Sequence, residues 1–236
     1  LWVKGATHGF QDDWSYYSSM ARTADPTDIP RRLAEAGYAL FNQAGYNATG
    51  ISQITERAGV PKGSFYNHYE SKEAFAVAIV RLYAKMVDQA WQESLTTAPA
   101  SPFGAIAHVF TMFADHHGRN ECQGCLVGNF AGEIARASPA CQQALDDTLT
   151  DWRNRLAVLI ERAQAAGQAR TDLDAHTLAG FFWDAWEGAL LRAKIAGHIG
   201  PLQDTLNLML DKVIAAPSAQ GTTSASPPTR RLQGET

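Results

Sequence analysis

Residues 52–69 read SQITERAGVPKGSFYNHY, the most informative pattern in the chain. It predicts a short helix after Gly50, a tight turn at Gly59, and a second short helix from Pro61 to about residue 69. Helices of about two turns do not persist alone in water. We therefore expect the apolar side chains of both helices to pack against a preceding helix and against Phe75; these side chains are Ile54, Ala58, Val60, Phe65 and Tyr69.

The second helix should project polar side chains from the surface, which is the arrangement of a DNA-binding helix-turn-helix. Lys62 can donate to guanine, and Asn67 can pair bidentately with adenine. Gly63 has no side chain, so the backbone can approach a partner closely. Contacts to phosphate oxygens, which position a protein without reading sequence, can come from Tyr66, His68 and Lys72.

The charge of this segment is weak. Residues 29–72 contain five Lys or Arg and three acidic residues, a net charge of +2, in a chain whose formal net charge is −4. A single copy should therefore bind DNA poorly. Two copies double the phosphate contacts and read two half-sites about 34 Å apart, one turn of B-DNA. The sequence thus predicts a homodimer on a palindromic stretch of double-stranded DNA.

Residues 29–80 resemble the TetR-family signature. The matching residues are Tyr46, Thr49, Ile51, Ile54, Ala58-Gly59-Val60, Gly63-Ser64-Phe65-Tyr66, His68-Tyr69 and Ser71-Lys72-Glu73. The resemblance implies a recognition helix over residues 61–69 in the major groove, which presents Lys62, Gly63, Ser64, Asn67 and His68 to DNA. It also implies phosphate contacts from Tyr66 and Lys72, and a close approach of Thr49 and Ser52 to the DNA backbone. The alternative is a three-helix unit that only turns polar residues towards solvent.

Almost every other segment of the chain has a helical period, and nothing reads as a sheet. A helix after Pro30 ends at Gly45, and Ser71 suits the N-cap of a helix long enough to link two domains. Ser138 with Pro139 marks another helix start. We expect an all-α chain with a helix-turn-helix domain at 29–75, a ligand-binding and dimerisation domain at 76–215, and a glycine-rich corner at 118–128.

Two later helices are candidates for the dimer contact. Residues 142–166 and 174–196 repeat apolar side chains at three- and four-residue steps, the spacing of helix-on-helix packing. Paired with their symmetry mates they would form a four-helix bundle, as the family resemblance implies. The alternative is an ordinary core within one chain, to which part of each stripe must belong.

The segment Gly124-Cys125-Leu126-Val127-Gly128-Asn129, with the tryptophan-rich stretch 183–194, is similar to the branch of TetR-type repressors that respond to acrylate or thiol-reactive electrophiles. In that branch the Gly-Cys motif lies by the effector pocket, and the position matching Cys125 is a sensor thiol in some members. Arg192 or Lys194 would hold a carboxylate, unless both simply face solvent. The candidate pocket walls, each of which could instead be plain core, are apolar with a few polar groups: Phe110, Phe113, His117, Cys125, Asn129, Trp183, Trp186 and Glu187.

The chemistry of Cys125 leaves several interpretations open. Neighbouring His116, His117 and Arg119 would give it thiolate character and make it a target for a Michaelis acceptor, whereas a small buried hydrophobe is the commoner state of a lone cysteine. Cys122 and Cys125 with the two histidines suggest a weak zinc motif, and a thiol redox protein is a third alternative without the usual βαβ surroundings. No base and orienting acid stand in a recognisable catalytic arrangement. We expect no enzyme activity and no cofactor.

Composition limits the class of protein. The hydrophobic fraction of 45% suits a buried core, three cysteines are too few for a secreted disulfide framework, and no apolar run is long enough to span a bilayer. A cytoplasmic protein that does not bind membranes is expected. Residues 1–28 look like an irregular extension whose natural start is Met20, and residues 216–236 look like a disordered tail.

Overall fold

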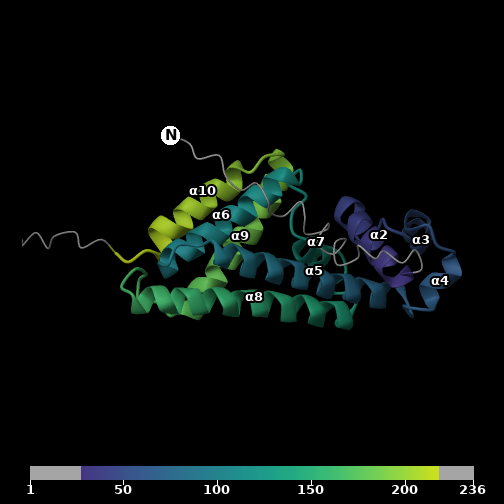
Figure 1. The fold of residues 1–236 in the computed structure, drawn as a ribbon, viewed down its shortest axis with the longest axis horizontal. Helices are drawn as coiled ribbons and strands as arrows, with labels where there is room; N and C mark the ends of the chain where they lie inside the picture. Colours follow the sequence, from purple (N-terminus) through teal and green to yellow (C-terminus); the bar gives the residue numbers. More distant parts are fainter. Residues whose placement is uncertain (1–27, 218–236) are drawn as a thin grey trace, which may run out of the picture.

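The computed structural model describes residues 28–217, and this part of the chain is built from helices (Figure 1). The expected all-α fold is confirmed. The expected extension at 1–27, the Met20 start and the tail from 218 lie outside the described residues. The helices are α2 (Ile29–Ala44), α3 (Ile51–Ala58), α4 (Lys62–Tyr66), α5 (Lys72–Thr96), α6 (Pro102–Arg119), α7 (Leu126–Glu133), α8 (Pro139–Ala165), α9 (Ala175–Ala196), α10 (Gly200–Leu208) and the π-helix η1 (Met209–Ile214).

Side-chain caps explain where several helices begin. The Ser71 hydroxyl accepts a hydrogen bond from the backbone N–H of Ala74 at 3.0 Å, and Ser138 does the same for Cys141 at 3.0 Å. Both caps satisfy a backbone donor that has no partner inside its helix. Gly59 ends α3 in the left-handed conformation at φ 63°. These starts and this turn were predicted from the sequence and are confirmed.

The three N-terminal helices share an aromatic core with the start of α5. Phe65 of α4 is fully buried, and its ring lies 5.2 Å from that of Phe75 in an edge-on contact. Tyr69 contacts the same Phe75 ring at 4.7 Å. Gly37 of α2 lies directly beneath this ring, because a Cβ added there would come within 2.3 Å of it. The short helix α4 is therefore held by tertiary packing, since it contains only five residues.

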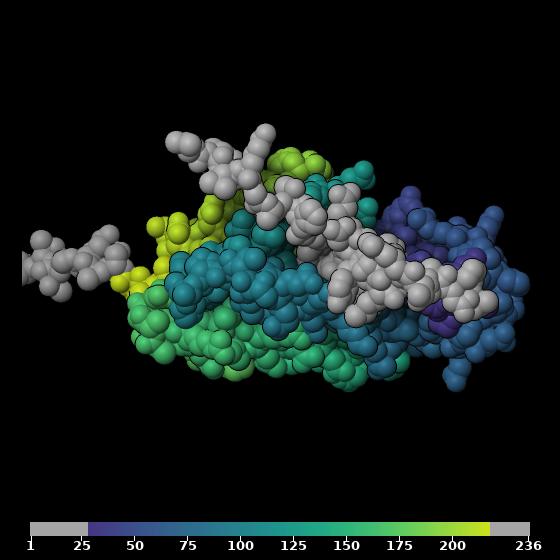
Figure 2. All heavy atoms as spheres, viewed as in Figure 1, coloured from purple at the N-terminus to yellow at the C-terminus, as the bar shows by residue number. Residues whose placement is uncertain are grey.

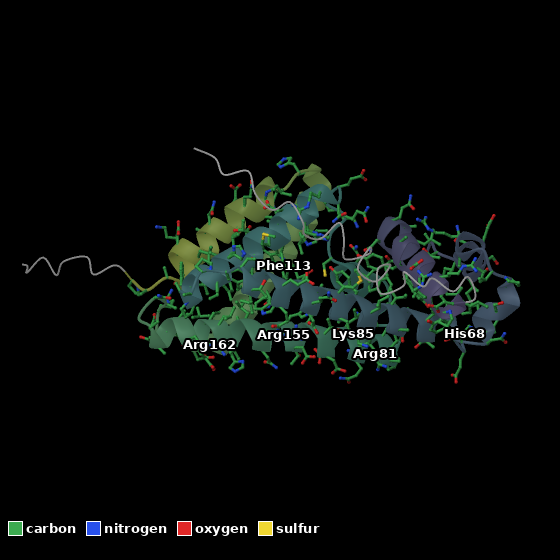
Figure 3. All side chains as sticks on the ribbon, viewed as in Figure 1. His68, Arg81, Lys85, Phe113, Arg155 and Arg162 are labelled. Carbon is green, nitrogen blue, oxygen red and sulfur yellow. The ribbon has the colours of Figure 1, made fainter. Side chains whose placement is uncertain are left out.

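Two long helices connect this N-terminal unit with the body of the molecule. In the space-filling view the purple and blue helices α2 to α4 form one end, against a larger teal to yellow body (Figure 2). The helix α5 runs through both parts, and α8 lies along it in the same direction: Ser138 bonds to Glu73 at one end, and Arg155 pairs with Asp88 further along. Figure 3 accordingly places His68 at the opposite end of the molecule from Arg162.

The glycine-rich corner predicted at 118–128 is shorter than expected. Helix α6 continues to Arg119, and α7 already begins at Leu126. Between them, Glu121 and Cys122 adopt left-handed φ angles of 54° and 51°. The sequence did not predict α7, because its eight residues include two glycines and are too few to display a helical period.

Candidate DNA interface and effector cavity

The surface of α4 presents the side chains that the sequence assigned to DNA. Lys62, Asn67 and His68 are exposed, and Tyr66 is 54% exposed although it is a large aromatic residue. Ser64 is half-buried, and Ser52 of the preceding helix is exposed. Phe65 fixes the opposite side of the helix in the core. The fold therefore turns one polar and aromatic surface outward at the end of the molecule. The contact of these side chains with DNA stays a prediction.

Gly63 lies in the middle of this surface. A Cβ added at this position would meet nothing within 4 Å, so the fold itself does not require glycine there. A close approach of the backbone to an external partner is one reason for a missing side chain.

Thr49 and Lys72 are both at least partly buried. Thr49 is 2% exposed, and its hydroxyl donates to the backbone oxygen of Gly45 at 2.7 Å, so its side chain faces the protein interior and its approach to DNA stays a prediction. This hydrogen bond stabilises the end of α2. Lys72 is half-buried with its ammonium 4.0 Å from the centre of the Tyr46 ring. Burial lowers the pKa of Lys72, against the opposing influence of Glu133.

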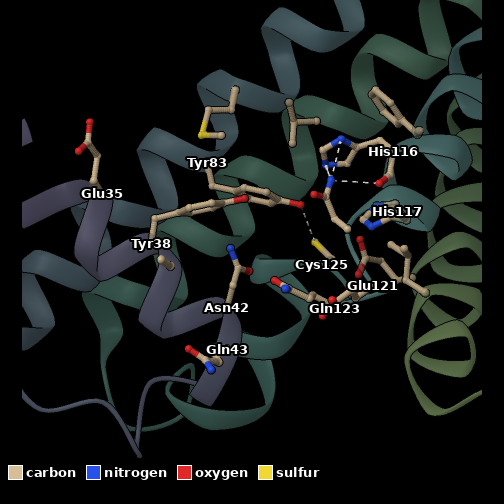
Figure 4. A pocket seen from close by; sticks show the side chains of 18 of the residues that line it. Glu35, Tyr38, Asn42, Gln43, Tyr83, His116, His117, Glu121, Gln123 and Cys125 are labelled. Atoms are coloured by element: carbon tan, nitrogen blue, oxygen red, sulfur yellow. Dashed lines mark hydrogen bonds between the residues drawn. The ribbon is translucent and has the colours of Figure 1, made fainter. Parts of the chain in front are cut away.

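A cavity of about 890 Å³ lies between the N-terminal unit and the body. Its wall includes side chains of α2 as well as residues of α5, α6, α8, α9 and the corner before α7. Figure 4 shows Tyr38 and Asn42 of α2 on one side, with Tyr83, His116 and Cys125 close by. A compound in this cavity would touch α2, which packs against α3 and against Phe75, and the Phe75 ring contacts Phe65 of α4.

Six of the eight predicted pocket residues line this cavity: Phe113, His117, Cys125, Trp183, Trp186 and Glu187. Phe110 is not among them. It is fully buried behind the wall, where its ring packs against Phe113, Trp183 and Trp186 at 5.0 to 5.8 Å.

Asn129 also lies elsewhere. It lines a smaller pocket of about 180 Å³ beside Lys194, whose ammonium donates to the Asn129 side-chain oxygen at 3.1 Å. Lys194 therefore already has an acceptor outside the main cavity, and Arg192 is exposed.

The sequence missed the wall that the N-terminal unit contributes. Tyr38 and Asn42 stand one turn apart on α2, and Tyr83 and Trp152 come from the two long helices. Tyr38 and Tyr83 stack at 6.1 Å, and Trp152 stacks on Trp183 at 5.4 Å. The available signal for this wall was the four-residue spacing of Tyr38 and Asn42 on α2. The apolar pattern of the same helix, however, indicated the core of the DNA-binding unit.

Cys125 lies at the start of α7 and is 5% exposed. Burial raises the pKa of its thiol well above the ordinary value, and the nearby Glu187 carboxylate raises it further. Backbone N–H groups of Gly128 and Val127 oppose this rise only in part. Of the two interpretations of Cys125, burial and the nearby carboxylate favour the small buried hydrophobe over the thiolate. The Tyr83 hydroxyl lies 3.9 Å from the sulfur.

The histidines that were expected to activate Cys125 carry no charge near neutral pH. Burial lowers the pKa of His116 to about 3, with further lowering by His117 and Arg119, and burial lowers the pKa of His117 to about 4. Among the described residues, no group of three or more His, Cys, Asp or Glu side chains is arranged to hold a metal ion. The three cysteines are buried and unpaired thiols.

Glu187 is the acid at the inner wall of the cavity. Burial raises the pKa of its carboxyl to about 7, with a small opposing effect of the hydrogen bond to Cys125. Its Oε2 lies against α7, because a Cβ added to Gly128 would stand 2.7 Å from it. A side chain in this position can change its protonation within the physiological range.

The helix α7 connects the cavity with the N-terminal unit. Its first cap residue is Cys125 in the cavity wall, and its last residue is Glu133. The Glu133 carboxylate accepts a hydrogen bond from the backbone N–H of Asn47 at 2.7 Å. Phe130 packs edge-on against Phe41 of α2 at 5.2 Å. One end of α7 therefore lies in the cavity wall, and the other end contacts the N-terminal unit.

One face of α9 is apolar and open to solvent. Phe181, Leu191 and Ile195 are 58%, 60% and 79% exposed, and a Cβ added to Gly188 between them would meet nothing within 4 Å. Phe181 therefore lies on the open side of α9, whereas Trp183 and Trp186 of the same helix are buried. An exposed apolar patch of this kind is typical of protein contact surfaces.

No helix in residues 28–217 is long and apolar enough to cross a membrane.

Comparison with known proteins agrees with both halves of this arrangement. Residues 33–79 match the model of bacterial regulatory proteins of the tetR family, and residues 104–209 match a tetracyclin repressor-like C-terminal domain. The HTH-type transcriptional repressor DhaR of Mycobacterium sp. (strain GP1) is 31% identical over 200 residues, which cover 85% of this chain and 98% of that protein.

Two further relatives agree. The transcriptional regulator AcuR of Cereibacter sphaeroides is 36% identical over 178 residues, 72% of this chain and 78% of that protein. The crystal structure of a regulatory protein TetR from Rhodobacter sphaeroides superposes with a TM-score of 0.73 at 31% identity, and the match covers 77% of this chain and 97% of that one. Such proteins are DNA-binding regulators and not enzymes. The chain belongs to the TetR family of transcriptional regulators.

Proposed function

We propose that this regulator is a cytoplasmic repressor that binds a palindromic operator as a homodimer and leaves it when a small carboxylate or an electrophile occupies the cavity. The observation that carries the proposal is the position of the cavity, whose wall includes α2, the helix on which the DNA-binding unit is built. The similarity of the segment 124–129 to the acrylate- and electrophile-responsive branch supports the class of effector.

The DNA-binding part of the proposal uses the outward surface of α4. Lys62 and Asn67 read base edges in the major groove, and Gly63 lets the backbone come close. Ser64 and His68 add polar contacts. Tyr66 with Lys72 holds phosphates, and Ser52 lies near the DNA backbone from α3.

The dimer contact uses the apolar face of α9 together with α8. Large exposed side chains flank Gly188, so a symmetry mate can approach this face closely. Burial of an exposed Leu or Phe side chain contributes about 1.5 to 3 kcal/mol. Two copies joined here present two α4 helices to the half-sites of one operator.

Release follows from a difference in affinity. An effector shifts the protein only as far as it prefers the state that no longer fits the operator. A compound that packs against Tyr38 and Asn42 contacts α2 directly, and a compound that moves Cys125 shifts the start of α7, whose other end contacts the N-terminal unit through Glu133.

Selection of bound sequences from random DNA, repeated with acrylate and with an electrophile, tests this proposal. A palindromic sequence should emerge, and at least one of the compounds should reduce its recovery. The paired substitutions Tyr66→Ala and Lys72→Ala should weaken all DNA binding, whereas Asn67→Ala should relax base preference. Recovery of no preferred sequence at low ionic strength would contradict the proposal.

A further inference from the structure

Two buried polar atoms in the cavity wall have no hydrogen-bond partner within the described part of the chain. They are the indole Nε1 of Trp183, a residue that is 3% exposed, and the Oε1 atom of Glu187, whose carboxyl group otherwise has the hydrogen bond to Cys125 described above. Leaving a buried donor or acceptor unsatisfied costs about 1 to 3 kcal/mol. Proteins rarely leave such atoms unpaired without a reason, and a ligand that bonds to both would remove the cost.

The two atoms belong to one small region. Trp183 and Glu187 stand four residues apart on α9, so they share one face of the helix with Cβ atoms about 5 to 6 Å apart. One is a donor and the other is an acceptor when Glu187 is ionised. The other oxygen of Glu187 is held against α7 beside Gly128. The pair therefore offers one donor and one acceptor close together. It matches a compact ligand group that carries one acceptor and one donor.

Among the described residues, the two arginines that line the cavity come from the N-terminal unit, Arg32 from α2 and Arg57 from α3, and neither stands on α9 or α7 with the pair. Lys194 donates to Asn129 at the separate, smaller pocket. His116 and His117 are desolvated and uncharged near neutral pH. Arg32, at the α2 side of the cavity, donates to the backbone oxygen of Gly59 at 2.8 Å. A bare carboxylate beside an ionised Glu187 would add a second buried negative charge, which is strongly unfavourable.

We propose that the inner end of this cavity binds a small carboxylic acid together with one proton, which is shared between the ligand carboxyl group and Glu187, while Trp183 donates to the other ligand oxygen. The ligand and its proton add no net charge beyond that of an ionised Glu187. The proton comes from solvent, and no covalent bond is formed or broken. A primary amide presents the same shape with its own donor, so it binds without taking up a proton. This inference rests on the proposed function, because it specifies the effector chemistry of the same cavity.

The surroundings of Glu187 leave it as the group that titrates near neutral pH. Burial raises the pKa values of the Tyr38, Tyr83 and Cys125 side chains, so these stay protonated, and the two histidines of α6 stay neutral. Arg57 of α3 and the acids Glu35 and Glu121 also line the cavity. A proton taken up on binding near pH 7 therefore resides between the ligand and Glu187.

Calorimetric titration of the full chain with propionate and propionamide, from about pH 6 to about pH 8.5, tests the inference. This saturated pair cannot alkylate Cys125. Wild-type affinity for propionate should fall about tenfold per pH unit above about pH 7, and affinity for propionamide should not fall. In Glu187→Gln the side-chain amide supplies the donor, so propionate affinity should become independent of pH. Trp183→Phe should weaken both compounds by about tenfold while the propionate slope remains.

Glu161→Gln is the matched control, since Glu161 is an exposed acid on α8. It should reproduce the wild-type slope. Three results would overturn the inference: a flat propionate profile in the wild type, an unchanged slope in Glu187→Gln, or no binding of either compound. The DNA selection tests the proposed function separately. If an electrophile released the operator but propionate binding were not linked to a proton at Glu187, only the inference would be refuted.

Discussion

The buried Glu187 carboxyl should make the stability of the protein depend on pH in a way that a single substitution removes. Burial raises its pKa from the ordinary 4.5 to about 7. At roughly 1.4 kcal/mol per pH unit, this difference corresponds to about 3 kcal/mol. Because the pKa is raised in the folded state, the contribution to stability is fully present below pH 4.5 and is lost as the pH rises through 7.

The buried histidines act in the opposite direction. Their pKa values fall from 6.5 to about 3 and about 4, so their contribution is present above pH 6.5 and is lost on acidification. The stability of the wild type alone therefore does not isolate Glu187. The difference between Glu187→Gln and wild type does, because the histidines are common to both proteins.

Urea denaturation followed by circular dichroism, at one fixed protein concentration, measures this difference. The free energy of unfolding of Glu187→Gln relative to wild type should rise by about 2.5 kcal/mol between about pH 5 and about pH 8. Glu161→Gln should show no such trend. An equal difference at the two pH values would refute the reasoning, because it would mean that Glu187 ionises in the folded protein as it does in water.

Four other substitutions test the remaining features, one of them with a matched control. Gly37→Ala should lower the free energy of unfolding by about 1 to 3 kcal/mol, since its Cβ meets a buried ring at 2.3 Å. Gly63→Ala should not lower stability, because its Cβ meets nothing within 4 Å, but it should reduce DNA binding in gel shifts. Leu191→Glu should shift size-exclusion chromatography towards the monomer and weaken operator binding, whereas Leu208→Glu, 59% exposed on α10, should not. Glu133→Ala should reduce the effector-induced change in operator affinity by about tenfold, measured by gel shift with and without effector. Full release by effector in Glu133→Ala would exclude a role for α7 in the response.

The sequence predicted the N-terminal unit well, because its signals are local. Gly59 must adopt a left-handed conformation, Ser71 must cap the helix that follows, and Phe65 must be buried for so short a helix to exist. Each of these requirements is met by residues within one or two turns of each other. The direction of a side chain is harder to predict from sequence. Thr49 is an example, because a hydroxyl near a helix end can hydrogen-bond to the backbone as readily as to a ligand.

The cavity was only partly predictable for a different reason. Trp183, Trp186 and Glu187 repeat on one helix, so their shared face can be seen in the sequence. Tyr38 lies about 150 positions away along the chain, and only the packing of the N-terminal unit against the body brings it to the same wall. The state of Cys125 could not be inferred from its histidine neighbours in sequence, because burial and a carboxylate 62 positions away decide it.

The double use of α2, as wall of the cavity and as support of the DNA-reading helix, has a consequence for the protein in the cell. Coupling between two binding events is reciprocal, so a factor by which an effector weakens operator binding is also the factor by which the operator weakens effector binding. Repressor molecules seated on the chromosome would then be less sensitive to the inducer than free ones. The tighter a given operator holds the repressor, the more inducer its release would require.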